Sequence, residues 1–244
     1  DTGLSSRIQN DSFNKDNVNK TIIRNYIRYY LRLPIKSEYT IDDMADDGVS
    51  VLDHLNIENA HILGISMGGM IAQIMASSYP EKTKTFTLIA STASTPSPFN
   101  GPSKDVRRLF IERTKNVDAT IEDRVSRTKK LFKLIGYQGI DLDTQEFSDN
   151  VKLSIERGGV DDTGFGRQLT AILGSKNRIE KVRSISAPTL IIHGKEDPLI
   201  GVKNAYRSNK LIKGSKLVII DNMRHLIEPP VFDQFKSDLL THLK

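Results

Sequence analysis

Short apolar runs alternate with helical patterns along much of this chain. Four runs rich in aliphatic and β-branched residues predict buried strands, because each is too short to form a typical helix. They lie at residues 60–64, 85–91, 188–194 and 215–221. Segments with apolar residues at three- and four-residue spacing separate them, so the strands should be parallel and joined by crossover helices. The pattern predicts a three-layer α/β fold with a mostly parallel sheet.

Two helices around the first strand can be placed from local signals. Thr40 followed by Asp43 is a capping box, which predicts the start of a helix that ends near Asn56. A second helix should begin after Ser66 and stop at Pro80. The apolar residues expected on the buried side of the first helix are Ile41, Met44, Leu52 and Leu55.

Residues 7–37 are polar at first and then follow a helical pattern. Arg24, Arg28 and Arg32 stand four residues apart, opposite a set of apolar residues. A helix of this kind can lie on a membrane, but we expect a solvated surface helix. The longest mostly apolar run, residues 62–76, is too short to span a bilayer and contains Gln73. We therefore expect no membrane partner.

The interval 95–181 breaks the alternation of strands and helices. It opens with a proline-containing loop and continues as helices rich in lysine and arginine, without a convincing strand. We expect a helical lid at 95–181, inserted into an α/β core formed by residues 1–94 and 182–244. Residues 104–133 carry ten Lys or Arg against five Asp or Glu. A solvated face is the expected role of this charge, and attraction of carboxylate-bearing substrates is the alternative.

Gly64-Ile65-Ser66-Met67-Gly68 is a G-x-S-x-G pentapeptide between a predicted strand and a predicted helix. A nucleophile elbow has this arrangement, with the serine exposed at the carboxyl end of the sheet. Both flanking glycines should be required, since the turn is too tight for side chains there. Ser66 is the candidate nucleophile, and the backbone N–H of Met67 is the first candidate oxyanion donor. A glycine turn with a purely structural role is the alternative.

A serine hydroxyl needs a histidine base, which in turn needs a carboxylate to orient it. Of the five histidines, only His225 lies in the loop after the last strand, and structural or solvated positions fit the other four. Asp197 and Glu196 follow the strand at 188–194. We favour Asp197, because Pro198 stiffens its loop, and Glu196 stays open. Asp221 is too close to the end of its strand to turn back onto the imidazole.

The chain order Ser66, Asp197, His225 is that of the α/β-hydrolases. Over most of its length the chain resembles the esterase-like branch of that superfamily, which includes aclacinomycin methylesterase. The stretches that carry the resemblance are residues 1–6 (DTGLSS), 39–92, 164–178 and 187–200 (APTLIIHGKEDPLI). The resemblance implies Ser66 as nucleophile, Asp197 as acid and His225 as base, with an acyl-enzyme intermediate, no cofactor and no metal. It also implies that the insertion is a lid over the pocket.

One part of the family pattern is missing. In the family, further strands precede the DTGLSS stretch, and a His-Gly-type segment after one of them supplies the second oxyanion donor. These 244 residues contain no such segment, so the second donor has no candidate. We expect the N-terminal strands to be absent, with strand 60–64 at the sheet edge or covered by residues 7–37 or another chain. We also expect this polypeptide by itself to be poorly stable and nearly inactive.

Composition narrows the range of functions. The net charge of +5 is mild, and no nucleic-acid-binding signature occurs, so no nucleic-acid partner is expected. The absence of cysteine excludes disulfides and fits a cytoplasmic location. The favoured function is hydrolysis of a small-molecule carboxylic ester, and homo-oligomer formation is left open. The alternatives are amide or imino-peptide hydrolysis, C–C bond hydrolysis or perhydrolysis by the same triad, and a non-catalytic ligand-binding protein.

Overall fold

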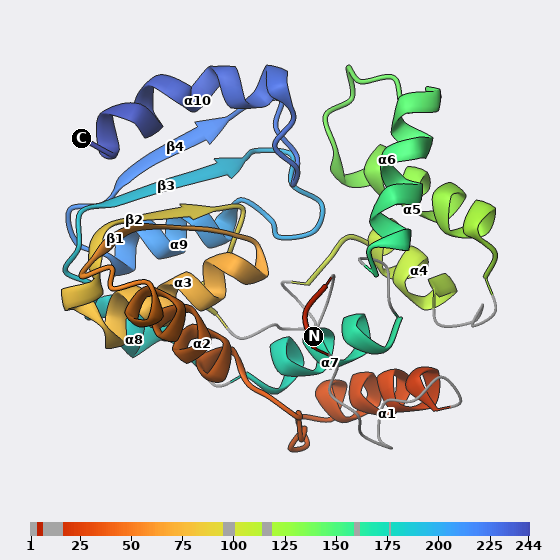
Figure 1. Ribbon diagram of the computed structural model, residues 1–244, viewed down its shortest axis with the longest axis horizontal. Helices are drawn as coiled ribbons and strands as arrows, with labels where there is room; N and C mark the ends of the chain where they lie inside the picture. The colour runs from red at the N-terminus through yellow and green to blue at the C-terminus, as the bar shows by residue number, and fades with distance from the viewer. Residues whose placement is uncertain (1–3, 7–16, 95–100, 114–118, 159–161, 176) are drawn as a thin grey trace. The chain divides into compact units, whose positions relative to one another are not determined.

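The residues of the computed structural model fall into two compact units, a helical unit and a sheet unit (Figure 1). The described residues are 4–6, 17–94, 101–113, 119–158, 162–175 and 177–244. The helical unit comprises Asp1–Glu38, Ser103–Leu134 and Gln138–Gly174, and the sheet unit comprises Tyr39–Pro102, Ile135–Tyr137 and Ser175–Lys244. Residues 1–38 thus cluster with the helices of the expected insertion. The role of that insertion as a lid stays a prediction.

Four parallel strands form the centre of the sheet unit, in the spatial order β1-β2-β3-β4. They are β1 (Ala60–Ile65), β2 (Thr83–Ile89), β3 (Thr189–Gly194) and β4 (Lys216–Ile220). Each neighbouring pair is parallel, with Ile62 opposite Phe86 and Ile89 opposite Ile192. These are the four predicted strands, with their ends shifted by one or two residues. The predicted parallel α/β sheet is confirmed.

Helices cover both faces of this sheet (Figure 1). One face packs on α3 (Met67–Ser78), α8 (Ile179–Arg183) and α9 (Lys203–Leu211), and the other on α10 (Pro229–His242). The side chains of β2 and β3 alternate between the two cores: Leu88 and Ile191 join the first, and Ile89 and Ile192 join the second. Because both faces of the central strands are covered, all of β3 and all of β2 except Lys84 are buried, and β3 contains a continuous apolar run from Leu190 to Ile192.

Helix α2 (Ile41–His54) begins at the predicted capping box. The Asp43 N–H donates to Thr40 Oγ1 at 3.1 Å, and the Thr40 N–H donates to Asp43 Oδ2 at 2.7 Å. The predicted buried side is only partly right, since Leu55 lies beyond the last helical residue and is 58% exposed. The buried residues are instead Ile41, Ala45 and Val49. Close packing on α3 determines which side of α2 is buried. The sequence of α2 alone does not contain this information.

Strand β1 lies at one end of the sheet, as expected. In the part of the chain that the structure describes, its only strand neighbour is β2. The Leu63 and Ile65 side chains of β1 are 44% and 41% exposed. An edge strand presents backbone N–H and C=O groups without strand partners, so this side of the sheet is open to further pairing.

The helical unit contains α1 (Val18–Tyr30), α4 (Lys104–Arg113), α5 (Ile121–Ile135, whose last residue belongs to the sheet unit), α6 (Gln145–Glu156) and α7 (Asp162–Gly174). Val18 and Ile22 of α1 pack near Leu169 of α7. The other side of α1 is exposed and carries the apolar Ile23, Ile27 and Tyr30, which the sequence pattern places opposite the arginines. None of the helices in the described ranges combines the length and apolarity needed to cross a membrane.

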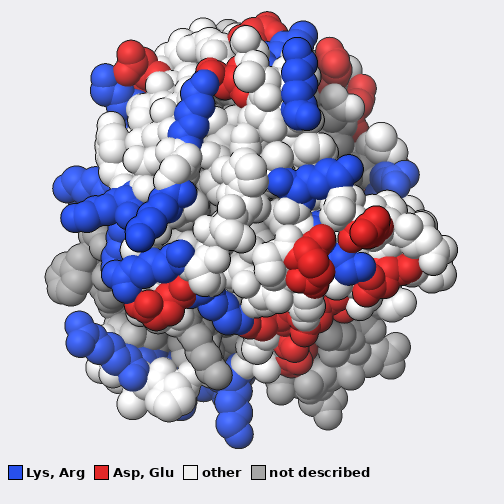
Figure 2. Space-filling view, turned by 90° about the vertical axis from the view of Figure 1, so that its left-hand side faces the viewer, with Lys and Arg blue, Asp and Glu red and all other residues white. Residues whose placement is uncertain are grey.

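Charge is unevenly spread over the face of the molecule in Figure 2. Blue Lys and Arg side chains and red Asp and Glu side chains form separate groups there, beside a broad uncharged area.

The turn from β1 to α3 contains two glycines that steric contacts require. A Cβ at Gly64 would lie 2.3 Å from the carbonyl oxygen of Gly68, and one at Gly69 would lie 2.6 Å from Ser91 Cβ. A Cβ at Gly68 would meet nothing within 4 Å. The sequence-based expectation is thus right for Gly64 and wrong for Gly68. Gly69 replaces Gly68, because α3 approaches Ser91 after β2 at that residue.

We expect Gly64→Ala and Gly69→Ala to lower the free energy of unfolding, by about 1–3 kcal/mol or more, because the new methyl group overlaps neighbouring atoms. The loss should be larger for Gly64→Ala, whose neighbours are backbone atoms that cannot rotate away. Gly68→Ala is the matched control and should leave stability unchanged or slightly higher, since alanine favours helix. Urea denaturation followed by circular dichroism measures the three values. Equal destabilisation by all three substitutions would contradict this account of the turn.

Candidate active site

Ser66 has a strained backbone at the turn between β1 and α3. Its φ of 53° and ψ of −119° are rare for a residue with a side chain. Hydrogen bonds to its backbone N–H and carbonyl hold it there. The Ser66 N–H donates to the Ile89 carbonyl at 3.0 Å, and the Ser66 carbonyl accepts from Gly69 N at 3.0 Å and from Ser91 Oγ at 2.7 Å. The strain is therefore maintained by β2 and α3 together.

The Ser66 side chain is not used to stabilise α3. Ser66 is the N-cap residue of this helix, yet its hydroxyl makes no capping hydrogen bond. Met67 is the first helical residue, and the first N–H groups of a helix have no acceptor within it. A hydroxyl, backbone N–H donors and the positive end of a helix dipole thus lie together, which is typical of a nucleophile elbow.

Asp197 follows β3, and N–H donors surround its carboxylate. Oδ1 accepts from the backbone N–H groups of Leu199 and Ile200, at 2.8 and 2.9 Å. Oδ2 accepts from His225 Nδ1 at 2.8 Å, and His193 Nε2 lies 3.4 Å from the same oxygen. The side chain is completely buried.

Asp197 is ionised at neutral pH despite this burial. Burial by itself raises the pKa of the carboxyl group, but hydrogen bonds from His193, His225 and the Ile200 backbone outweigh it and bring the pKa to about 2. The buried negative charge can therefore stabilise a positive charge on the neighbouring imidazole.

His225 lies in the loop after β4 and is almost fully buried. Its backbone N–H donates to the Ile135 carbonyl at 2.8 Å, and its Nδ1 contacts Asp197. Nδ1 therefore carries the proton in the neutral ring, and Nε2 is left as a base. The loop can come this close only because β3 ends in a glycine: a Cβ at Gly194 would lie 2.1 Å from the Arg224 carbonyl oxygen.

The other two carboxylates considered for this role point to other partners. Glu196 Oε2 lies 3.9 Å from Arg224 Nε, and its side chain is 57% exposed. Asp221 accepts from Lys195 Nζ at 2.7 Å on the surface. Between Asp197 and Glu196, the geometry therefore favours Asp197.

Two of the three proposed catalytic side chains are in direct contact. Asp197 and His225 form a hydrogen bond, whereas no hydrogen bond joins Ser66 Oγ to His225 among the described residues. All three follow the carboxyl ends of parallel strands, so they lie along one edge of the sheet. The complete triad stays a prediction, and the second oxyanion donor stays unassigned.

His193 has a buried, hydrogen-bonded position, which is one of the two positions expected for it. The sequence did not predict that its ring would contact Asp197 as well as the Ile200 carbonyl. The available signal was its place in the sequence, immediately before the glycine that opens the loop of Asp197.

In the described ranges, no three His, Asp or Glu side chains come together as metal ligands.

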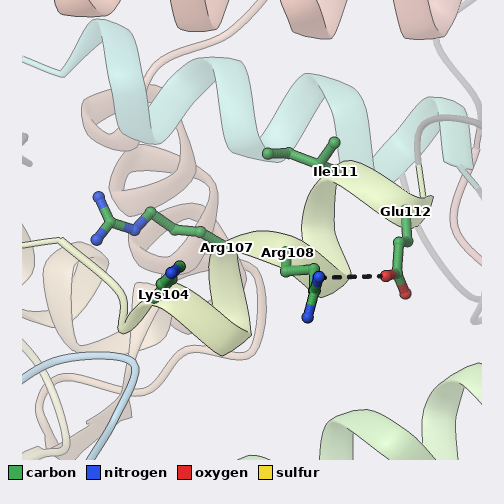
Figure 3. Close-up of a pocket in the computed structure, with 5 residues that line it drawn as sticks. All are labelled: Lys104, Arg107, Arg108, Ile111 and Glu112. Atoms are coloured by element: carbon green, nitrogen blue, oxygen red, sulfur yellow. Dashed lines mark ion pairs between the residues drawn. The ribbon is translucent and has the colours of Figure 1, made fainter.

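A second feature with charged side chains lies in the helical unit, on α4. Figure 3 shows a surface pocket of about 530 Å³ there. Its lining residues are Lys104, Arg107, Arg108, Ile111 and Glu112. Arg108 Nε lies 4.0 Å from Glu112 Oε1. Because three of the lining residues are cations and only one is an anion, the pocket lining has an excess of positive charge.

The sequence and the fold of this chain are similar to those of known proteins. Rhodomycin D methylesterase DnrP of Streptomyces peucetius is 24% identical over 221 residues, covering 84% of this chain and 74% of that protein. 3-Oxoadipate enol-lactonase 1 of Acinetobacter baylyi is 26% identical over 207 residues, covering 84% and 73%. A solved structure of a meta-cleavage product hydrolase from Pseudomonas fluorescens matches with a TM-score of 0.64 at 21% identity, covering 86% and 73%.

The family itself is assigned by a model described as the alpha/beta hydrolase fold, which matches residues 21–227. The parallel sheet, with helices on both faces, agrees with this match. The match spans most of the sequence, so the chain belongs to the α/β-hydrolase fold family, and the expected resemblance to its esterase-like members is confirmed.

Proposed function

We propose that this chain is a serine hydrolase that cleaves a small carboxylic ester through Ser66, His225 and Asp197. The observation that carries the proposal is the 2.8 Å contact between Asp197 Oδ2 and His225 Nδ1, which leaves Nε2 of a buried imidazole available as a base. The strained serine at the start of α3 supplies the matching nucleophile. Relatives named as a methylesterase and an enol-lactonase favour an ester as the substrate.

Each group has one role in the proposed reaction. His225 Nε2 takes the Ser66 proton as Oγ attacks the ester carbonyl, and the Met67 N–H stabilises the oxyanion that forms. The imidazolium then gives its proton to the departing alcohol, which leaves an acyl group on Ser66. Water, deprotonated by His225, attacks this acyl-enzyme and releases the acid. Asp197 holds the imidazole and offsets its positive charge throughout.

The main alternative is a hydrolase fold that binds a ligand without reacting. The strained Ser66 backbone, which costs on the order of 1–3 kcal/mol, indicates a functional site but is compatible with either role. A fluorophosphonate probe separates the two, since it labels only an activated serine rapidly. Amide, C–C and perhydrolysis chemistry would use the same residues. A panel of p-nitrophenyl esters with increasing acyl length tests which acyl group is preferred.

A second proposal concerns the charge of the substrate. The sequence of residues 104–133 contains ten basic and five acidic residues, and three of these cations line the pocket on α4. A local positive potential raises the concentration of anions nearby without direct contact. We therefore propose that esters bearing a carboxylate reach the enzyme faster than neutral ones.

We expect Ser66→Ala to lower kcat/KM for a reactive p-nitrophenyl ester by about 10⁴- to 10⁶-fold, because no other group replaces the nucleophile. The circular dichroism spectrum should be unchanged. Ser77→Ala is the control: Ser77 is also on α3, but its hydroxyl only bonds the Ile74 carbonyl. Normal turnover by Ser66→Ala would end the proposal of a serine mechanism.

The pH dependence of stability should report on the carboxylate of Asp197. Its pKa is lowered from 3.8 to about 2, so its contribution is fully present above about pH 4 and is lost as the pH falls through 2. Between pH 5 and pH 2, wild type should lose on the order of 2 kcal/mol more unfolding free energy than Asp197→Asn. Asp221→Asn, which removes an exposed carboxylate, should follow wild type. Parallel curves for wild type and Asp197→Asn would contradict the buried, ionised carboxylate.

The substrate-charge proposal can be tested with a neutral ester and its carboxylate-bearing analogue. We expect a higher kcat/KM for the anion at low salt, and a smaller difference at high salt because ions screen the attraction. The double variant Lys104→Gln/Arg108→Gln should reduce the preference. Lys210→Gln/Lys213→Gln, which removes two exposed cations from the sheet unit, is the matched control. A preference that is absent, or that salt does not change, rules the idea out.

A further inference from the structure

His193 is a polar side chain inside the most buried strand of the sheet. All six residues of β3 are buried, and the His193 ring is 1% exposed. A buried imidazole needs hydrogen-bond partners, because an unpaired ring nitrogen loses its hydration without compensation. The partners of this ring lie in the loop that carries Asp197.

The first partner fixes which ring nitrogen holds the proton. His193 Nε2 lies 2.6 Å from the Ile200 carbonyl oxygen, and a carbonyl can only accept. Nε2 therefore carries the hydrogen in the neutral ring. The same N–H lies 3.4 Å from Asp197 Oδ2, a weaker contact that adds to the field at that oxygen.

These contacts hold the loop at both of its ends. The Ile200 N–H donates to Asp197 Oδ1 at 2.9 Å, while the Ile200 carbonyl accepts from His193. Ile200 is thus tied to Asp197 through its nitrogen and to β3 through its oxygen. If the His193 contact were lost, the residue that anchors the carboxylate would be free to move.

We infer that His193 is a positioning residue for Asp197, which closes the loop around this carboxylate and shares its Oδ2 oxygen with His225. The inference rests on the proposed triad. It assigns a role in the site to His193, which is not proposed to contact the substrate or the nucleophile.

Sharing one oxygen between two imidazole N–H groups has a chemical consequence. The N–H of His193 draws negative charge from Oδ2, so Asp197 is a weaker partner for a protonated His225. Without His193, Asp197 should stabilise a protonated His225 more strongly. The base must be neutral to accept a proton, so the acid limb of kcat/KM should move to higher pH.

The other charged groups nearby have partners of their own. Lys195 pairs with Asp221 on the surface, Arg224 faces Glu196, and Glu228 accepts the Tyr137 N–H. All of them remain in a variant of His193. A shift of the acid limb on substitution of His193 can therefore be assigned to the imidazole itself.

The test compares pH profiles of kcat/KM for a p-nitrophenyl ester. In His193→Phe, which keeps a ring but removes the N–H, we expect a loss of about 10- to 100-fold. The acid limb should shift upward by about half a unit to one unit. His193→Gln retains an N–H and should lie closer to wild type in both values. His61→Phe is the control, since His61 is on β1 and bonds only Thr85.

Three results would overturn the inference. One is a loss of activity in His193→Phe with an unmoved acid limb, which would mean a purely structural role; another is a profile identical to wild type. The third, which needs no variant to fold, is a nuclear magnetic resonance spectrum of wild type in which His193 is not protonated on Nε2 at neutral pH. Ser66→Ala separates this from the function: if it stays active, the triad fails whatever His193 does.

Discussion

A buried carboxylate must be surrounded by hydrogen-bond donors, and the need to satisfy Asp197 organises the carboxyl edge of this sheet. Its two oxygens take backbone N–H groups from Leu199 and Ile200 and ring nitrogens from His225 and His193. Those donors come from β3, from the loop after it and from the loop after β4. Removing the carboxyl group would leave several buried donors without an acceptor, which costs more than the bonds themselves contribute. The two loops are thus held together by one carboxylate.

The parallel sheet makes this arrangement possible. Parallel strands all end at the same edge, so residues far apart in the sequence can meet there. Close approach of the chains then depends on residues without side chains. Gly194 lets the loop of His225 pass next to β3, and Gly64 lets the first turn of α3 approach β1. The strain at Ser66 is sustained because β2 and α3 fix its backbone on both sides.

The two units differ in how they are stabilised. The sheet unit has apolar cores on both faces of β2 and β3, whereas the helical unit pairs α1 with α7 through a small apolar cluster and one buried hydrogen bond, from Asn25 to Thr170 at 3.0 Å. A buried Arg178 also belongs to the sheet unit and bonds Gln73, Ser175 and Thr92. Burial lowers the pKa of Arg178 to about 10, which still leaves it charged at neutral pH. Its contacts join residues 175–178, at the end of the expected insertion, to α3 and to the segment after β2.

Local patterns in the sequence determined the four strands, the capping box of α2 and the position of Ser66 between a strand and a helix. Each depends on residues within a few positions of one another, whose spacing and type already carry the information. The sequence also favoured Asp197 and His225 as candidate residues, because both follow parallel strands whose carboxyl ends lie at the same edge of the sheet. The tertiary structure alone decided that Gly69 rather than Gly68 is required and that Leu55 is exposed. It also decided that α1 clusters with the helices of the expected insertion, and that His193 contacts Asp197. These outcomes depend on contacts between elements, and an apolar or polar residue does not encode by itself which distant neighbour it will meet.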